Sequence, residues 1–201
     1  MENQNGEEKG YGFLETVIRD VVDVVKFSKS TEIAFEEYYK NPSFANIINV
    51  LNGVTSTDFY KLDNRTQHYV AFVVGLMCEK KLLDNDIKSE RRKKFNAFPN
   101  LSFIGSLTKN YIGSGKKDEN FKLRIVEVAN CKNADEIVSY IRTELTQYID
   151  RSFNAYWLVL NLLEAEKSEK STEEVLKKWI VYDFINKISG KKSDNGETKE
   201  D

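Results

Sequence analysis

The longest apolar run of the chain, residues 69–78, constrains the fold more than any other feature. A helix that spans a membrane needs about 20 apolar residues, so a run of ten indicates a helix inside a protein core. Because the run is apolar on every side, other elements must surround it. Asp63 or Asn64 can cap this helix, which should reach about Leu83. Gly75 within it costs a helix about 1 kcal/mol relative to alanine, so we expect a neighbouring backbone to cross closely there.

Apolar residues at three-and-four spacing, together with capping residues, divide the rest of the chain into further helices. The chain has only 2 prolines, so few positions interrupt these helices. The predicted segments are 11–27, 30–41 capped by Ser30 or Thr31, 43–53 opened by Ser43, 57–62, 88–95, 101–111 entered through Pro99, 118–128 capped by Asp118, 133–149 capped by Asn133, 153–163, and 171–188 with Ser171 and Glu174 as a capping box. The sequence therefore predicts an all-α fold, a helical bundle with two central apolar helices around residues 69–78 and 153–163.

The length of 201 residues suits one domain with a substantial core. We expect a single helical-bundle domain over residues 11–189, with disordered polar tails at 1–10 and 190–201. The first ten residues are polar and acidic and lack the basic and apolar regions of a secretory signal. We therefore expect a cytoplasmic protein without a membrane partner.

The sequence contains no recognisable catalytic or metal-binding motif. His68 is the single histidine, and no nucleophile or ligand pattern surrounds it, so we interpret it as structural. Cys78 and Cys131 lie far apart and form no CxxC pair, which is typical of buried thiols in a reducing compartment. Residues 113–116 resemble a phosphate-binding loop but lack the required spacing. We expect no cofactor, no metal and no enzymatic activity; an enzyme with unfamiliar carboxylate or lysine chemistry is the alternative.

The sharpest functional signal is a segregation of charge along the chain. Residues 80–124 contain 12 lysine or arginine residues against 5 acidic residues, a net of +7, whereas the remainder carries −9. A basic surface of this kind attracts polyanions, because its cations neutralise phosphates and release condensed counterions. Phe95 and Phe98 lie among the cations, and an exposed aromatic ring can stack on an unpaired base. The candidate nucleic-acid-binding residues are Lys88, Arg91, Arg92, Lys93, Lys94, Lys109, Lys116, Lys117, Lys122 and Arg124.

Other interpretations of this charge stay open. The four consecutive cations 91–94 wrap nearly a full helical turn, and a solvated basic helix with both phenylalanines in the core explains them as well as a binding site does. The basic face can also dock onto an acidic protein, or onto a second copy of the chain in a homo-oligomer. Since no base-reading motif is present, nucleic-acid binding should follow the phosphate backbone with weak sequence preference.

Three features together resemble a known family: the segment Tyr-Val-Ala-Phe-Val-Val-Gly-Leu at 69–76 before a basic helix, the Phe-Pro-Asn-Leu entry at 98–101, and the apolar segment 155–160. The succession resembles the C-terminal helical part of CRISPR Cascade large subunits, or the related small helical subunits, over about residues 65–165. The resemblance implies a non-catalytic bundle that lines a ribonucleoprotein filament beside other subunits, where lysines and arginines support RNA or single-stranded DNA. We therefore expect a nucleic-acid-associated subunit of such an assembly.

Overall fold

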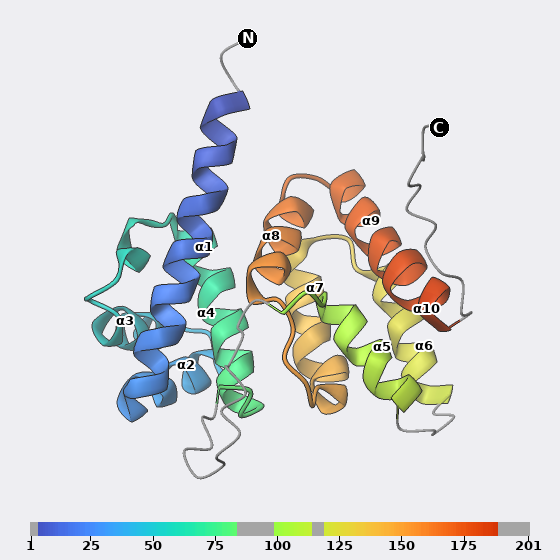
Figure 1. The fold of residues 1–201 in the computed structure, drawn as a ribbon, viewed down its shortest axis with the longest axis horizontal. Coiled ribbons are helices and arrows are strands. Elements are labelled where there is room, and N and C mark those ends of the chain that lie inside the picture. The colour runs from blue at the N-terminus through green and yellow to red at the C-terminus, as the bar shows by residue number, and fades with distance from the viewer. Residues whose placement is uncertain (1–3, 84–98, 114–118, 189–201) are drawn as a thin grey trace, which may run out of the picture.

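The computed structural model describes residues 4–83, 99–113 and 119–188 (Figure 1). Every regular element within these ranges is a helix, which confirms the predicted all-α class. The predicted helix 88–95 and the predicted cap Asp118 lie outside the described residues. The elements are α1 (Gln4–Phe27), α2 (Lys29–Lys40), α3 (Phe44–Gly53), η1 (Asp58–Lys61), α4 (Asn64–Glu79), α5 (Phe103–Gly113), α6 (Glu119–Glu127), η2 (Val128–Asn130), α7 (Ala134–Tyr140), η3 (Ile141–Leu145), η4 (Thr146–Tyr148), α8 (Ala155–Glu166), α9 (Glu169–Lys177), η5 (Lys178–Ile185) and α10 (Asn186–Ile188). Of the η elements, η3 and η5 are π-helical and the others are 3₁₀ turns.

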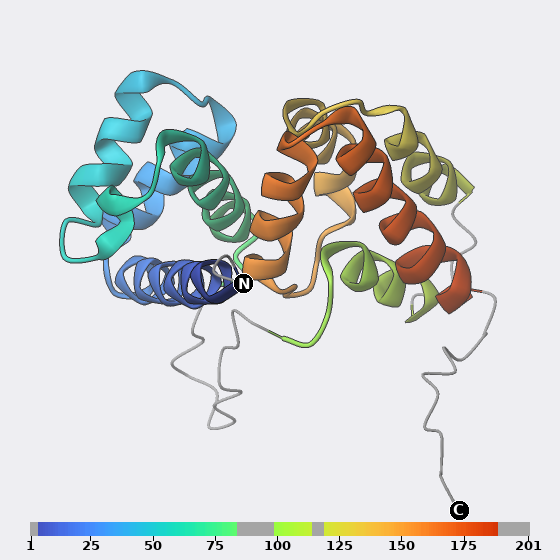
Figure 2. The ribbon, with the colours of Figure 1, turned by 90° about the horizontal axis from the view of Figure 1, so that it is seen from above.

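The helices form two halves that meet along α4 and α8 (Figures 1 and 2). Helices α1 to α4 make up one half, and α5 to α10 make up the other. Helix α4 packs against α2 in its own half and against α8 in the other, while α8 also contacts α7 and α9. The buried side chains of both halves belong to one continuous hydrophobic core.

Helix α4 is the central helix that the apolar run predicts. Its N-cap is Asp63, whose Oδ1 accepts hydrogen bonds from the backbone amides of Arg65 and Thr66 at 3.0 Å each. Every residue from 69 to 78 is buried, because α2 and α8 cover opposite sides of the helix. The helix ends at Glu79, short of the predicted end at Leu83.

Gly75 lies where α2 crosses α4, as the sequence analysis predicts. A Cβ placed on Gly75 would lie 2.3 Å from the backbone oxygen of Phe35 and 2.8 Å from the Cβ of Tyr39. Cβ atoms are not found so close to backbone oxygens, so only glycine permits this approach of the two helices. Glycine makes the isolated helix less stable, but the close crossing of α2 and α4 requires it.

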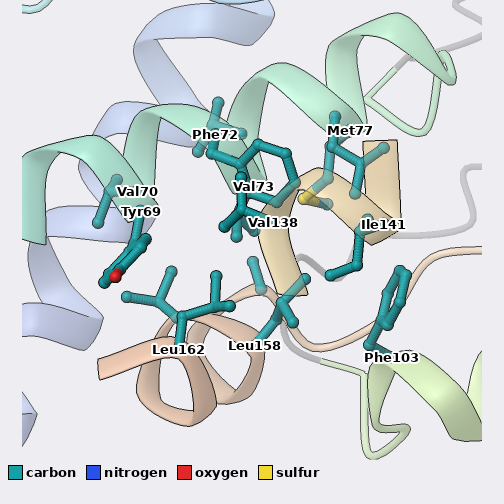
Figure 3. Packing of buried hydrophobic residues seen from close by; sticks show 14 of the residues in the cluster. Tyr69, Val70, Phe72, Val73, Met77, Phe103, Val138, Ile141, Leu158 and Leu162 are labelled. Carbon is teal, nitrogen blue, oxygen red and sulfur yellow. The ribbon is translucent and has the colours of Figure 1, made fainter. Parts of the chain in front are cut away.

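Helix α8 is the second central helix. Asn154 caps it by accepting a hydrogen bond from the Trp157 amide, and the side chains of Leu158 and Leu162 are fully buried. Figure 3 shows both leucines pointing toward Tyr69 and Val73 of α4. This contact is the apolar part of the junction between the two halves.

Three predicted helix starts were wrong or displaced. The capping box at Ser171 was wrong: Ser168 caps α9 by accepting the Ser171 amide at 3.1 Å, and Thr172 is buried inside the helix with its hydroxyl donating to the Ala165 carbonyl. Likewise Ser28, and neither Ser30 nor Thr31, caps α2. Helix α1 begins at Gln4, within the segment expected to be a polar tail, and Gln, Glu and Lys in that segment are good helix formers.

Within the described residues, no helix has the length and apolar character needed to cross a membrane.

Candidate functional site

The structure describes three of the ten predicted nucleic-acid-binding residues. Lys88, Arg91, Arg92, Lys93, Lys94, Lys116 and Lys117 lie outside the described residues. Lys109 is exposed on α5, four residues before the end of that helix. In Figure 1, α4 and α5 both end at the lower edge of the molecule, where α6 begins. The residues that follow these two helices in sequence, 84–98 and 114–118, carry a net positive charge, lie outside the described residues, and are called the two basic connections.

Lys122 and Arg124 on α6 already have carboxylate partners. Lys122 Nζ lies 2.8 Å from Glu119 Oε1, whereas Arg124 contacts Glu127 at 2.8 Å through Nη1 and Glu144 at 3.1 Å through Nε. The hydrogen bond to Glu119 raises the pKa of Lys122, and that to Glu127 raises the pKa of Arg124. A phosphate would have to displace these carboxylates, so these two residues are poor candidates for contacts with the phosphates of a nucleic acid.

Two further cations lie where the first basic connection begins. Lys80 caps the C-terminus of α4, and the exposed Lys81 follows it with a left-handed backbone (φ 52°). Neither residue is among the predicted nucleic-acid-binding residues, although both fall within the basic range 80–124. Their position at the end of a helix that reaches the edge could not be known from the sequence, because the predicted helix ran on to Leu83.

His68 lies in a cleft between the two halves and is half-buried. The Tyr38 hydroxyl lies 2.7 Å from His68 Nδ1. Burial raises the pKa of Tyr38 and lowers the pKa of His68, so both groups are neutral near pH 7. A Tyr38 hydroxyl that donates to Nδ1 fixes the neutral imidazole with its proton on Nε2. The contact agrees with the prediction of a structural histidine that is satisfied by a neighbour.

Arg65 on α4 connects the two halves by charge. Its Nη1 lies 3.0 Å from Asp135 Oδ1 at the start of α7, and its Nη2 lies 2.8 Å from Glu166 Oε1 at the end of α8. The hydroxyl of the buried Tyr69 donates to the other oxygen of Glu166. Burial, followed by this bond to Glu166, raises the pKa of Tyr69. The sequence does not predict this network, because Asp135 and Glu166 lie 70 and 101 residues after Arg65.

The cleft beside this network has a volume of about 460 Å³. Ile47 and the 82% exposed Phe44, both of α3, line it. His68, Arg65 and Asp135 line it as well. The cleft thus combines an aromatic ring with polar groups that can donate or accept hydrogen bonds.

The described residues hold no cluster of three or more His, Cys, Asp or Glu side chains placed to bind a metal ion. Cys78 in α4 and Cys131 before α7 are free thiols, and both are buried. Burial raises the pKa of Cys78 well above its ordinary range and that of Cys131 to about 11. Neither thiol is thereby activated as a nucleophile.

The lowered pKa of His68 makes stability depend on pH. Desolvation lowers this pKa first, Arg65 and Arg142 lower it further, and Asp135 and Glu166 oppose them. Since the folded state binds the proton more weakly than the unfolded state, stability is full above the ordinary histidine pKa of about 6.5 and falls as the pH drops below it. We expect urea unfolding to show this loss in the parent protein and a smaller one in His68→Gln. Equal losses in both proteins would assign the effect to other groups.

The described residues form an all-α helical bundle with a polar cleft. Lys80, Lys81 and Lys109, beside the ends of α4 and α5, define what we call the basic edge. No protein-family model, no curated protein and no solved structure matches the chain.

Proposed function

We propose that the protein is a non-catalytic helical bundle that binds the phosphate backbone of RNA or single-stranded DNA. The observation that carries this proposal is the location of the described cations at the ends of the two helices that precede residues 84–98 and 114–118 in sequence. Lys80 and Lys81 directly follow α4, Lys109 lies near the end of α5, and both helices end at the lower edge of the molecule in Figure 1. The contacts come from Lys88, Arg91, Arg92, Lys93, Lys94, Lys109, Lys116 and Lys117. Cations that lie along one edge act together on a polyanion.

The ion pairs on α6 reduce the set of residues in the proposed interface. Glu119, Glu127 and Glu144 neutralise Lys122 and Arg124, and their negative charge repels phosphate. We therefore leave Lys122 and Arg124 out of the proposed contacts. Membership of a ribonucleoprotein assembly is part of the proposal, and it rests on the resemblance of residues 65–165 to CRISPR effector subunits.

Charge reversal tests the proposal. We expect the combined change of Arg91, Arg92, Lys93 and Lys94 to Glu to weaken binding of single-stranded oligonucleotides by roughly 100-fold at low salt, because four phosphate contacts become repulsive. Filter retention or fluorescence anisotropy at several salt concentrations measures the loss, with RNA and DNA oligonucleotides as separate probes. The dependence of affinity on salt should also become shallower.

A matched control has the same change in net charge at another place. The control reverses Lys167, Lys170, Lys177 and Lys178, which are exposed along and beside α9. Circular dichroism shows whether each variant keeps its helices. Parental affinity in the first variant, or an equal loss in the control, would contradict the proposed interface.

A second candidate function is protein docking, favoured by two phenylalanine side chains left in solvent. Phe27 at the end of α1 is 86% exposed and Phe44 is 82% exposed. Exposed aromatic rings are enriched in protein interfaces, and the basic edge would then face an acidic partner or a second copy. The material that co-purifies from the native host discriminates between the two functions, because bound nucleic acid raises the absorbance ratio at 260 and 280 nm.

A further inference from the structure

We propose that the cleft between α3 and α7 binds a small aromatic molecule that carries a neutral amide group. This site is separate from the basic edge and independent of the proposed nucleic-acid binding. The cleft is open to solvent and has a volume of about 460 Å³, which is enough for one small ring with a substituent. The inference rests on three parts of the cleft: a donor, an acceptor and an aromatic wall.

The donor is the imidazole of His68. Tyr38 Oη lies 2.7 Å from His68 Nδ1. We assign the hydroxyl as the donor in this bond, which puts the imidazole N–H on Nε2, where it can bind another partner. His68 is one of the residues that line the cleft. The rings of Tyr38 and Tyr69 pack beside the imidazole, with centroids 5.9 Å and 5.3 Å from it. A donor fixed in this way loses little freedom when a carbonyl oxygen binds to it.

The acceptor is the carboxylate of Asp135 at the start of α7. Arg65 Nη1 binds its Oδ1 at 3.0 Å and so fixes the side chain, whose relative exposure is 58%. An ionised carboxylate has about four acceptor positions, so one bond to arginine leaves capacity for an N–H donor. An amide group matches this pair of groups, because its oxygen accepts and its nitrogen donates.

The aromatic wall is Phe44, the first residue of α3. Ser43 caps that helix by accepting the Asn46 amide at 3.2 Å, which fixes the backbone from which Phe44 projects. Ile47, one turn further along, lines the same cleft. Binding of a flat ligand to an exposed phenylalanine is favourable, because the two rings stack and remove apolar surface from water.

The charges near the cleft select a neutral ligand. Arg65 carries one positive charge, but Asp135 and Glu166 both contact its guanidinium within about 3 Å. A carboxylate ligand would meet Asp135 without a free cation to offset the repulsion. An ammonium ligand would pair with Asp135 but would place a donor against the N–H of His68. The neutral amide avoids both conflicts.

The single histidine allows a direct test by NMR. Neutral benzamide is the probe, and benzoate and benzylamine carry the same ring with one negative and one positive charge, respectively. We expect benzamide to shift the His68 imidazole resonances saturably with a dissociation constant on the order of 1 mM, as for a fragment-sized ligand. Benzoate and benzylamine should bind at least about fivefold more weakly. The imidazole ¹⁵N shifts of the free protein should also report the Nε2–H tautomer.

Phe44→Ala and Phe27→Ala form a matched pair of variants. Both remove a phenylalanine that is more than 80% exposed, so both should keep the fold, but only Phe44 lines the cleft. Phe44→Ala should weaken benzamide binding about fivefold or more, and Phe27→Ala should leave it unchanged. The proposal is overturned if benzamide leaves the His68 resonances unshifted, if a charged probe binds as tightly as benzamide, or if the two variants bind it alike.

Discussion

Replacing Gly75 with alanine is expected to destabilise the protein by about 3 kcal/mol, although the same change stabilises most helices. Alanine favours a helix by about 1 kcal/mol over glycine, yet its Cβ would lie 2.3 Å from the backbone oxygen of Phe35. A backbone atom cannot rotate aside as a side chain can, so α2 must move away from α4. The free energy of unfolding in urea measures the effect.

Gly12 on α1 supplies the control for this change. A Cβ at Gly12 meets no atom within 4 Å, so Gly12→Ala should stabilise the protein by up to about 1 kcal/mol. If Gly12→Ala raises the free energy of unfolding and Gly75→Ala lowers it, the loss at Gly75 comes from the helix crossing and not from helix propensity. A Gly75→Ala protein as stable as the parent would mean that α2 does not pass this close to α4.

Phe72→Ala should cost about 4 kcal/mol of stability, in the range found for phenylalanine removed from a core. Phe72 is fully buried, and its ring centroid lies 5.5 Å from that of Tyr39 and 5.6 Å from the guanidinium carbon of Arg142. The substitution removes apolar contacts between α4, α2 and η3, and it takes away one of the two rings that face the arginine. Figure 3 shows the position of Phe72 on the central helix.

Thermal and urea unfolding check this second expectation. The control is Phe27→Ala, which removes the same side chain at a position that is 86% exposed and should change stability by less than about 0.5 kcal/mol. Similar costs at the two positions would contradict the burial of Phe72.

The sequence predicts the fold well where a local pattern decides the structure. Asp63, Ser43 and Asn133 cap the helices that were expected to begin after them, because an N-cap depends on side chains within three residues. The all-round apolar pattern of 69–78 and the glycine within it predict a surrounded helix with a close neighbour. Both features are confirmed: residues 69–78 are buried, and the backbone of α2 lies close to Gly75.

The sequence fails where packing decides between similar local choices. Residues 133–149 were expected to form one helix, but the chain passes into the π-helix η3 and then the 3₁₀ turn η4. The hydrogen-bond register of such segments follows from neighbouring elements, and side-chain spacing alone does not predict it. Ser171 has the pattern of a capping box, yet Thr172 bonds to α8 and draws the start of α9 back to Ser168.

The candidate sites also combine features that a local pattern predicts with features that depend on tertiary packing. The basic range 80–124 is visible in the sequence, but the carboxylates that neutralise Arg124 come from its own helix and from η3, 20 residues further along. Similarly, Arg65, Asp135 and Glu166 meet only because α4, α7 and α8 converge. Contacts of this separation are products of the tertiary fold and have no local signature.

The two buried cysteines have a practical consequence for following the motions of this molecule. Alkylating reagents attack the thiolate, and burial keeps both Cys78 and Cys131 protonated. Cys78 belongs to the half formed by α1 to α4, and Cys131 belongs to the other half. Each sulfur becomes reactive only when its surroundings open. The rate of alkylation at each cysteine therefore measures how often that half of the molecule opens.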